Sequence, residues 1–108
     1  MADFVVNNAG AKIYKDVERH EMIGIPVLSN EKEQGEVYNV LSVGILGGQR
    51  QPMATVKEDS GEIVAYRLPD DLYGWVENAM GMKAEGAEVF PTEVEFGKLD
   101  NRIYAEIL

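Results

Sequence analysis

The chain has 108 residues, no cysteine, and 19 acidic against 10 basic side chains, which give a formal net charge of −9. This length suffices for one hydrophobic core but not for two, so we expect a single domain over residues 1–108. The lack of cysteine excludes disulfide scaffolds, iron–sulfur clusters, zinc ribbons and thiol catalysis. The acidic balance disfavours direct binding to nucleic acid or membranes, because both require basic side chains.

The start of the chain lacks the basic segment and long apolar run that are typical of a secretory signal, and no apolar run approaches the length of a membrane span. We therefore expect a cytoplasmic protein. The charge is unevenly distributed: residues 1–54 hold seven acids and five bases, whereas residues 55–108 hold twelve acids and five bases. The acidic character therefore belongs mainly to the second half of the chain.

Alternating apolar residues and short turns predict strands in the first third of the chain. Residues 4–6 and 12–17 form a predicted hairpin, because the Asn and Gly residues at 7–10 tolerate positive φ. Ile23, Ile25 and Val27 would share one face of a third strand. Pro26 cannot donate a ladder hydrogen bond, so we expect this third strand at a sheet edge.

The middle of the chain predicts the centre of the sheet. Residues 37–46 are apolar at most positions on both faces, which is typical of a strand covered on two sides. Residues 53–57 return after Gly47 and Gly48, and a turn at residues 59–61 leads into a strand over 62–68.

One helix is predicted at about 70–80. Pro69, Asp70 and Asp71 are typical of a helix start, and Gly81 is placed just past its end. The predicted apolar face consists of Leu72, Trp75, Val76, Ala79 and Met80. A last hairpin joins strands at 88–96 and 102–108 through residues 97–101.

These elements predict an α+β fold that is mostly antiparallel β, with about seven or eight short strands and one helix packed on the sheet. The sheet is expected to be either a small, partly open barrel or a curved sheet.

The sequence contains few groups suited to catalysis. His20 is the only histidine, no serine lies in a Gly-x-Ser-x-Gly motif, and His20 falls in a polar stretch where an exposed histidine is ordinary. We therefore expect no enzyme and no catalytic residue. Residues 58–62 hold three acids but lack the spacing of a calcium loop, so we expect neither a metal nor another cofactor.

The loop of Gly47, Gly48, Gln49 and Arg50 is the best candidate for a small-ligand site. Paired glycines permit close approach of a backbone, and an arginine suits a carboxylate or phosphate. The alternative is an ordinary hairpin loop.

Acidic residues give a different signal near the last hairpin. In an extended strand, Glu93 and Glu95 would point outward about 6–7 Å apart, while Phe90, Val94 and Phe96 face the core. These glutamates could form an acidic binding surface together with Asp70 and Asp71, Glu85, and the turn acids Glu58, Asp59 and Glu62. Tyr73, which lies off the apolar face of the helix with Met80 and Met82 nearby, is a second candidate for contact with a partner. The alternative is that these charges only maintain solubility and prevent strand aggregation.

Three functional hypotheses follow. The first is a non-enzymatic protein-interaction module that binds a basic protein surface, as a nucleic-acid-mimicking inhibitor or an accessory protein similar to those of phages and prophages. The second is a structural component that forms homo-oligomers by pairing of edge strands. The third is a small-ligand-binding protein or small enzyme that uses the loop at residues 47–50.

Overall fold

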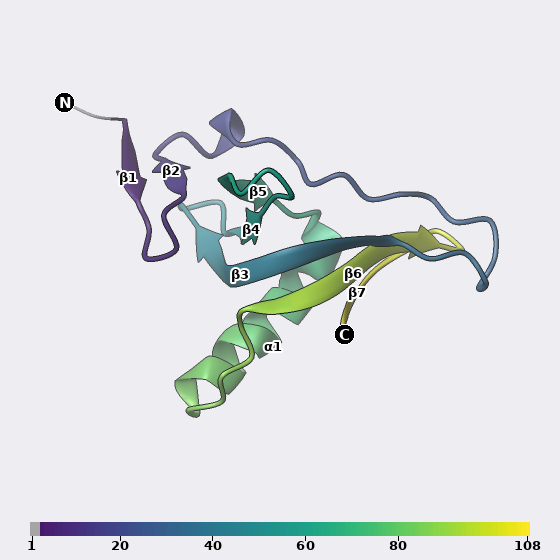
Figure 1. Ribbon diagram of the computed structural model, residues 1–108. Helices are drawn as coiled ribbons and strands as arrows, with labels where there is room; N and C mark the ends of the chain where they lie inside the picture. The colour runs from purple at the N-terminus through teal and green to yellow at the C-terminus, as the bar shows by residue number, and fades with distance from the viewer. Residues whose placement is uncertain (1–2) are drawn as a thin grey trace.

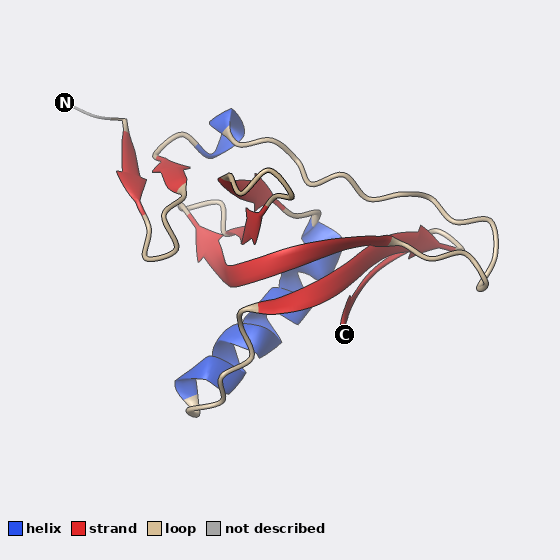
Figure 2. Cartoon of the chain, in the orientation of Figure 1, coloured by secondary structure: helices blue, strands red, loops and turns tan. Residues whose placement is uncertain are grey.

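The computed structural model describes residues 3–108. The described residues form a five-stranded antiparallel sheet in the order β5-β4-β3-β6-β7, a separate hairpin of β1 and β2, and one α-helix, α1 (Figure 1). The sheet is curved and is not closed into a barrel, with the helix lying across one face (Figure 2). The predicted α+β fold is thus confirmed in its curved-sheet form.

The strands are β1 (Phe4–Val6), β2 (Lys12–Tyr14), β3 (Glu36–Leu46), β4 (Gln51–Lys57), β5 (Ile63–Arg67), β6 (Thr92–Leu99) and β7 (Arg102–Ile107). The helix α1 spans Tyr73–Ala84, and two short 3₁₀ helices span Val17–Arg19 and Asp70–Leu72. The predicted central position of residues 37–46 is correct, because β3 lies in the middle of the strand order.

The helix covers one face of the sheet, and the β1–β2 hairpin covers part of the other. The β1–β2 hairpin lies on one face, where Asn7 donates a hydrogen bond from Nδ2 to Oγ1 of Thr55 at 2.9 Å. Beneath this hairpin is a small core of Ala11, Met53 and Ala65. The main core lies on the face towards the helix and consists of Ile23, Val40, Ala54, Val56, Leu68, Leu72, Val76, Val94 and Phe96. Strand β4 contributes to both cores, which explains why five consecutive residues in it, 52–56, are buried.

Val76 and Ala79 of α1 are buried, together with Leu72 of the 3₁₀ helix that precedes it, as the periodicity predicts. The end of α1 differs from the prediction, because the helix continues past Gly81 to Ala84. A glycine inside a helix costs only about 1 kcal/mol relative to alanine, so Gly81 does not by itself end the helix. Met80, predicted on the buried face, is exposed.

The predicted third strand at 23–27 is wrong. Residues 21–28 form an irregular segment, here called the strap, with isolated parallel bridges from Met22 to Arg67 and from Val27 to Lys98. The strap therefore joins the end of β5 to the end of β6 rather than following one strand. Ile23 is buried in the core, whereas Val27 is 74% exposed, so the two do not share a face. Pro26 lacks the N–H that a continuous ladder would need.

The last hairpin has different boundaries from those predicted. Strand β6 begins at Thr92 rather than at residue 88, and it includes residues 97–99. The turn consists only of Asp100 and Asn101, whose φ angles are 53° and 64°. Asp and Asn tolerate this left-handed conformation, so a two-residue turn suffices.

Candidate functional site

The register of β6 and β7 gathers acidic side chains on one face of the sheet. Glu95 stands opposite Glu106, and Glu93 precedes Glu95 by two residues on the same face. Val94 and Phe96 alternate with them and are fully buried, as predicted. We call Glu93, Glu95 and Glu106 the acidic face. Glu106 was not among the sequence-based candidates, because only the strand register reveals its position beside Glu95.

Glu95 is the most constrained member of the acidic face. Its carboxylate accepts hydrogen bonds from the Tyr104 hydroxyl and from the Gly35 N–H, the latter at 3.3 Å. The hydrogen bond to Glu95 raises the pKa of Tyr104 to about 12, with smaller contributions from burial and from the charges of Glu95 and Glu106. This hydrogen bond fixes the position of the Glu95 carboxylate on the face.

Asp59 lies close to this face. It shares a depression of about 670 Å³ with Glu93, lined also by Val37, Asn39, Leu41, Lys57, Pro91 and Thr92. The structure therefore brings one predicted acid of the β4–β5 turn beside one predicted acid of β6. Lys57 supplies a basic group to the same depression.

The other predicted acids are dispersed. Glu58 accepts a hydrogen bond from the Tyr66 hydroxyl, and this hydrogen bond is the main reason why the pKa of Tyr66 is raised. Glu62 lines a separate depression beside His20, and Glu85 is exposed at the end of α1. The predicted set is thus split among at least three places.

No ion pair within residues 3–108 involves the acidic face. The two ion pairs found there join Arg19 to Asp3 and Arg50 to Glu77.

The loop at residues 47–50 is engaged with the start of α1. The Arg50 guanidinium lies 5.4 Å from the centre of the Tyr73 ring and 3.9 Å from a carboxylate oxygen of Glu77. The Arg50 side chain thus lies against two groups of α1 while remaining largely exposed. Gly47, Gly48 and Gln49 are exposed, and Tyr73 is partly buried beneath the guanidinium.

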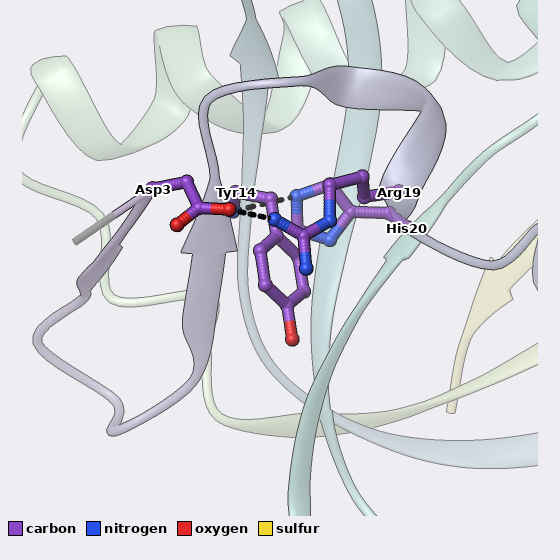
Figure 3. A network of polar contacts seen from close by, with 4 residues as sticks. All are labelled: Asp3, Tyr14, Arg19 and His20. Atoms are coloured by element: carbon purple, nitrogen blue, oxygen red, sulfur yellow. Dashed lines mark hydrogen bonds and ion pairs between the residues drawn. The ribbon is translucent and has the colours of Figure 1, made fainter.

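His20 is buried, with 4% of its surface exposed, which corrects the expectation of an exposed loop residue. Its Nε2 accepts a hydrogen bond from the Tyr14 N–H at 3.0 Å, as Figure 3 shows. Arg19 lies 4.3 Å from the centre of the Tyr14 ring and is paired with Asp3. The polar neighbours of His20 in sequence concealed its burial, because these side chains turn outward while the ring turns inward. His20 therefore has a structural role.

Within residues 3–108, no three His, Asp or Glu side chains are grouped closely enough to hold a metal ion. No helix in this described part of the chain is long and apolar enough to cross a membrane. Comparisons with protein-family models, curated proteins and solved structures find no match to this chain.

Proposed function

We propose that this protein is a non-enzymatic interaction module whose acidic face binds a basic surface of another protein. The observation that carries this proposal is the direct opposition of Glu95 and Glu106 on neighbouring strands. Like charges in this position destabilise a sheet, and no ion pair within residues 3–108 offsets their repulsion. A basic partner would relieve that repulsion, so the opposition of these two carboxylates favours binding of a basic surface.

Two further features support this proposal. Glu93 and Asp59 extend the negative charge to the depression beside β6. Tyr104 holds Glu95 in one position, which lowers the entropy lost when a partner binds. The spacing of Glu93 and Glu95 along one strand, about 6–7 Å, also suits a partner that normally binds nucleic acid. We therefore propose that the protein is an inhibitor or accessory protein that occupies the nucleic-acid-binding site of such a partner.

The test is charge reversal at Glu93 and Glu106, which leaves the Glu95–Tyr104 hydrogen bond intact. Partners are captured from lysate at low salt, identified by mass spectrometry, and purified for titration calorimetry. We expect a basic protein whose affinity falls at least tenfold in the Glu93→Lys, Glu106→Lys variant and also falls with rising salt.

The matched control is the Glu31→Lys, Glu33→Lys variant, which makes the same charge change at exposed positions outside the sheet. It should change the affinity by less than about threefold, because it alters only the general electrostatic attraction between the two proteins. Equal loss in both variants, or none in either, would show that the acidic face is not the binding surface.

The two other hypotheses remain testable by simple means. A homo-oligomer predicts a concentration-dependent mass above 12.0 kDa. A small-ligand site at residues 47–50 predicts that Arg50→Ala loses a bound molecule. The contacts of Arg50 with Tyr73 and Glu77 make this second alternative the less favoured one.

A further inference from the structure

Half of β3 has a strand neighbour on one side only. Strand β6 pairs with β3 over residues 36–40 and starts at Thr92, whereas β3 continues to Leu46 alongside β4. A register shift near Leu41 separates the two halves. Figure 1 shows the far half of β3 extending past the beginning of β6.

The direction of the backbone groups follows from the neighbouring strand. The Pro52 carbonyl accepts a hydrogen bond from the Leu68 N–H at 2.9 Å, so Pro52 faces the β5 side of β4. Backbone groups alternate along an antiparallel strand, so Met53 faces β3. Its partner Gly44 therefore forms its hydrogen bonds with β4.

The residues on either side of Gly44 must then face the opposite way. The N–H and C=O groups of Val43 and Ile45 point to the side where β6 has ended. Within residues 3–108, the strands paired with β3 are β4 and, up to Val40, β6. The edge thus presents two donors and two acceptors in the spacing of a β-ladder.

This edge lies in a groove. Three depressions of about 380, 180 and 500 Å³ all include Ser42 and Val43. The last of them is bounded by the β1–β2 tip, residues 7–9, and by Lys83 and Pro91. We call this combined feature the edge groove.

The two sides of the edge groove differ in chemistry. Towards the helix, the groove is lined largely by apolar residues, including Ala79, Met80, Val89 and Phe90. Towards the hairpin, it combines the polar side chains of Asn7, Ser42 and Thr55 with the apolar side chains of Ile13, Leu46 and Met53. An added strand points alternate side chains to opposite faces, so every second side chain would meet the apolar helix side, and those between would meet the mixed side that offers the polar groups of Asn7, Ser42 and Thr55.

We propose that the edge groove binds one extended segment of a partner protein as an additional strand beside β3. The segment has apolar residues at alternate positions, which face Met80 and Val89, and small polar residues between them. A second copy of this chain fits less well. The β1–β2 tip and the end of α1 flank the edge in each copy, so they would meet each other when two such edges pair. The proposal is independent of the acidic face.

The test uses a pool of ten-residue peptides that alternate Val, Ile or Leu with Ser, Thr or Asn. Each has lysine at both ends, which suits a protein with net charge −9. A pool with proline at alternate positions is the control, because it cannot form the ladder. We expect the first pool alone to shift the amide resonances of Val43 and Ile45 and to slow their hydrogen exchange. Absence of these changes at millimolar peptide would overturn the proposal.

Two pairs of variants separate backbone pairing from other effects. Ile45→Pro and Ile45→Ala both shorten the side chain, but only proline removes the outward N–H, so we expect at least tenfold weaker peptide binding for proline. Gly44→Lys places a charge in the groove, where an added side chain meets no atom within 4 Å, and Gly44→Ala is its control. We expect only the lysine variant to lose binding, and this pair decides the matter if Ile45→Pro fails to fold.

Two results would contradict the proposal. Equal peptide affinity within each folded pair would show that β3 does not accept a strand. Concentration-dependent shifts of Val43 and Ile45 without peptide would instead identify a second copy as the occupant. The Glu93→Lys, Glu106→Lys variant should bind the peptides within threefold of the unmodified protein, so failure of one proposal does not imply failure of the other.

Discussion

The substitution Gly97→Ala should disturb the acidic face from beneath. Gly97 is buried in β6 and lies opposite Tyr104 in β7. A Cβ atom at Gly97 would lie 2.6 Å from both Cε2 and the hydroxyl oxygen of Tyr104. Ordinary contact between nonbonded atoms needs about 3.5 Å, so the ring must retreat by about 1 Å. This movement separates the Tyr104 hydroxyl from Glu95.

Two energetic effects add in the variant. Overpacking costs about 1–3 kcal/mol of stability, and loss of the hydrogen bond costs about 1 kcal/mol more. We therefore expect the free energy of unfolding to fall by about 2–4 kcal/mol, measured by urea denaturation at pH 7. Tyr104→Phe, which removes only the hydroxyl, should cost about 1 kcal/mol, and the double variant should be less destabilised than the sum.

The pKa of Tyr104 provides an independent measure. Its raised pKa means that the hydrogen bond stabilises the fold fully below pH 10, and that this contribution is lost as the pH rises from 10 to about 12. NMR of the tyrosine Cζ atoms, with Tyr104→Phe to assign the signal, should show the pKa of Tyr104 falling towards 10.0 in Gly97→Ala. Unchanged stability together with an unchanged pKa would refute the reasoning.

Three further substitutions test the fold. Gly35→Ala places a Cβ atom 2.2 Å from the Phe96 carbonyl oxygen, so the backbone must move, and we expect the free energy of unfolding in urea to fall by about 3 kcal/mol or more. Gly81→Ala adds a Cβ atom in open space on α1 and should instead raise the free energy of unfolding by up to about 1 kcal/mol. His20→Phe retains a ring but leaves the Tyr14 N–H without its acceptor, so the free energy of unfolding should fall by about 1–3 kcal/mol. Thermal denaturation checks these expectations. They would be contradicted if Gly35→Ala were as stable as Gly81→Ala, or if His20→Phe were as stable as the unmodified protein.

Local patterns predicted much of the fold. The alternation of Val94 and Phe96 with two glutamates correctly indicated which side of β6 is buried. The helical spacing of Leu72 and Val76 likewise identified the face of α1 that packs on the sheet. These predictions succeed because the periodicity of a strand or helix directly determines which side chains share a face.

Features that depend on distant segments were not accessible. Glu106 joins the acidic face only because β7 pairs with β6 in one register, and sequence alone does not fix that register. His20 is buried by contacts with Tyr14 and with the Arg67 side chain, which donates to the His20 carbonyl. The open edge of β3 similarly results from where β6 begins, which the apolar residues before Thr92 obscured.

The strap has a consequence for folding during synthesis. Its Ile23 N–H donates to the Arg67 carbonyl, and its Leu28 N–H donates to the Lys98 carbonyl. These partners lie 67 − 23 = 44 and 98 − 28 = 70 residues later in the chain. Residues 21–28 therefore cannot complete their contacts until β6 has left the ribosome. Pausing before that point would leave Leu28 without its Lys98 partner and the core without Val94 and Phe96, so we expect the nascent chain to become resistant to protease only after the C-terminal hairpin emerges.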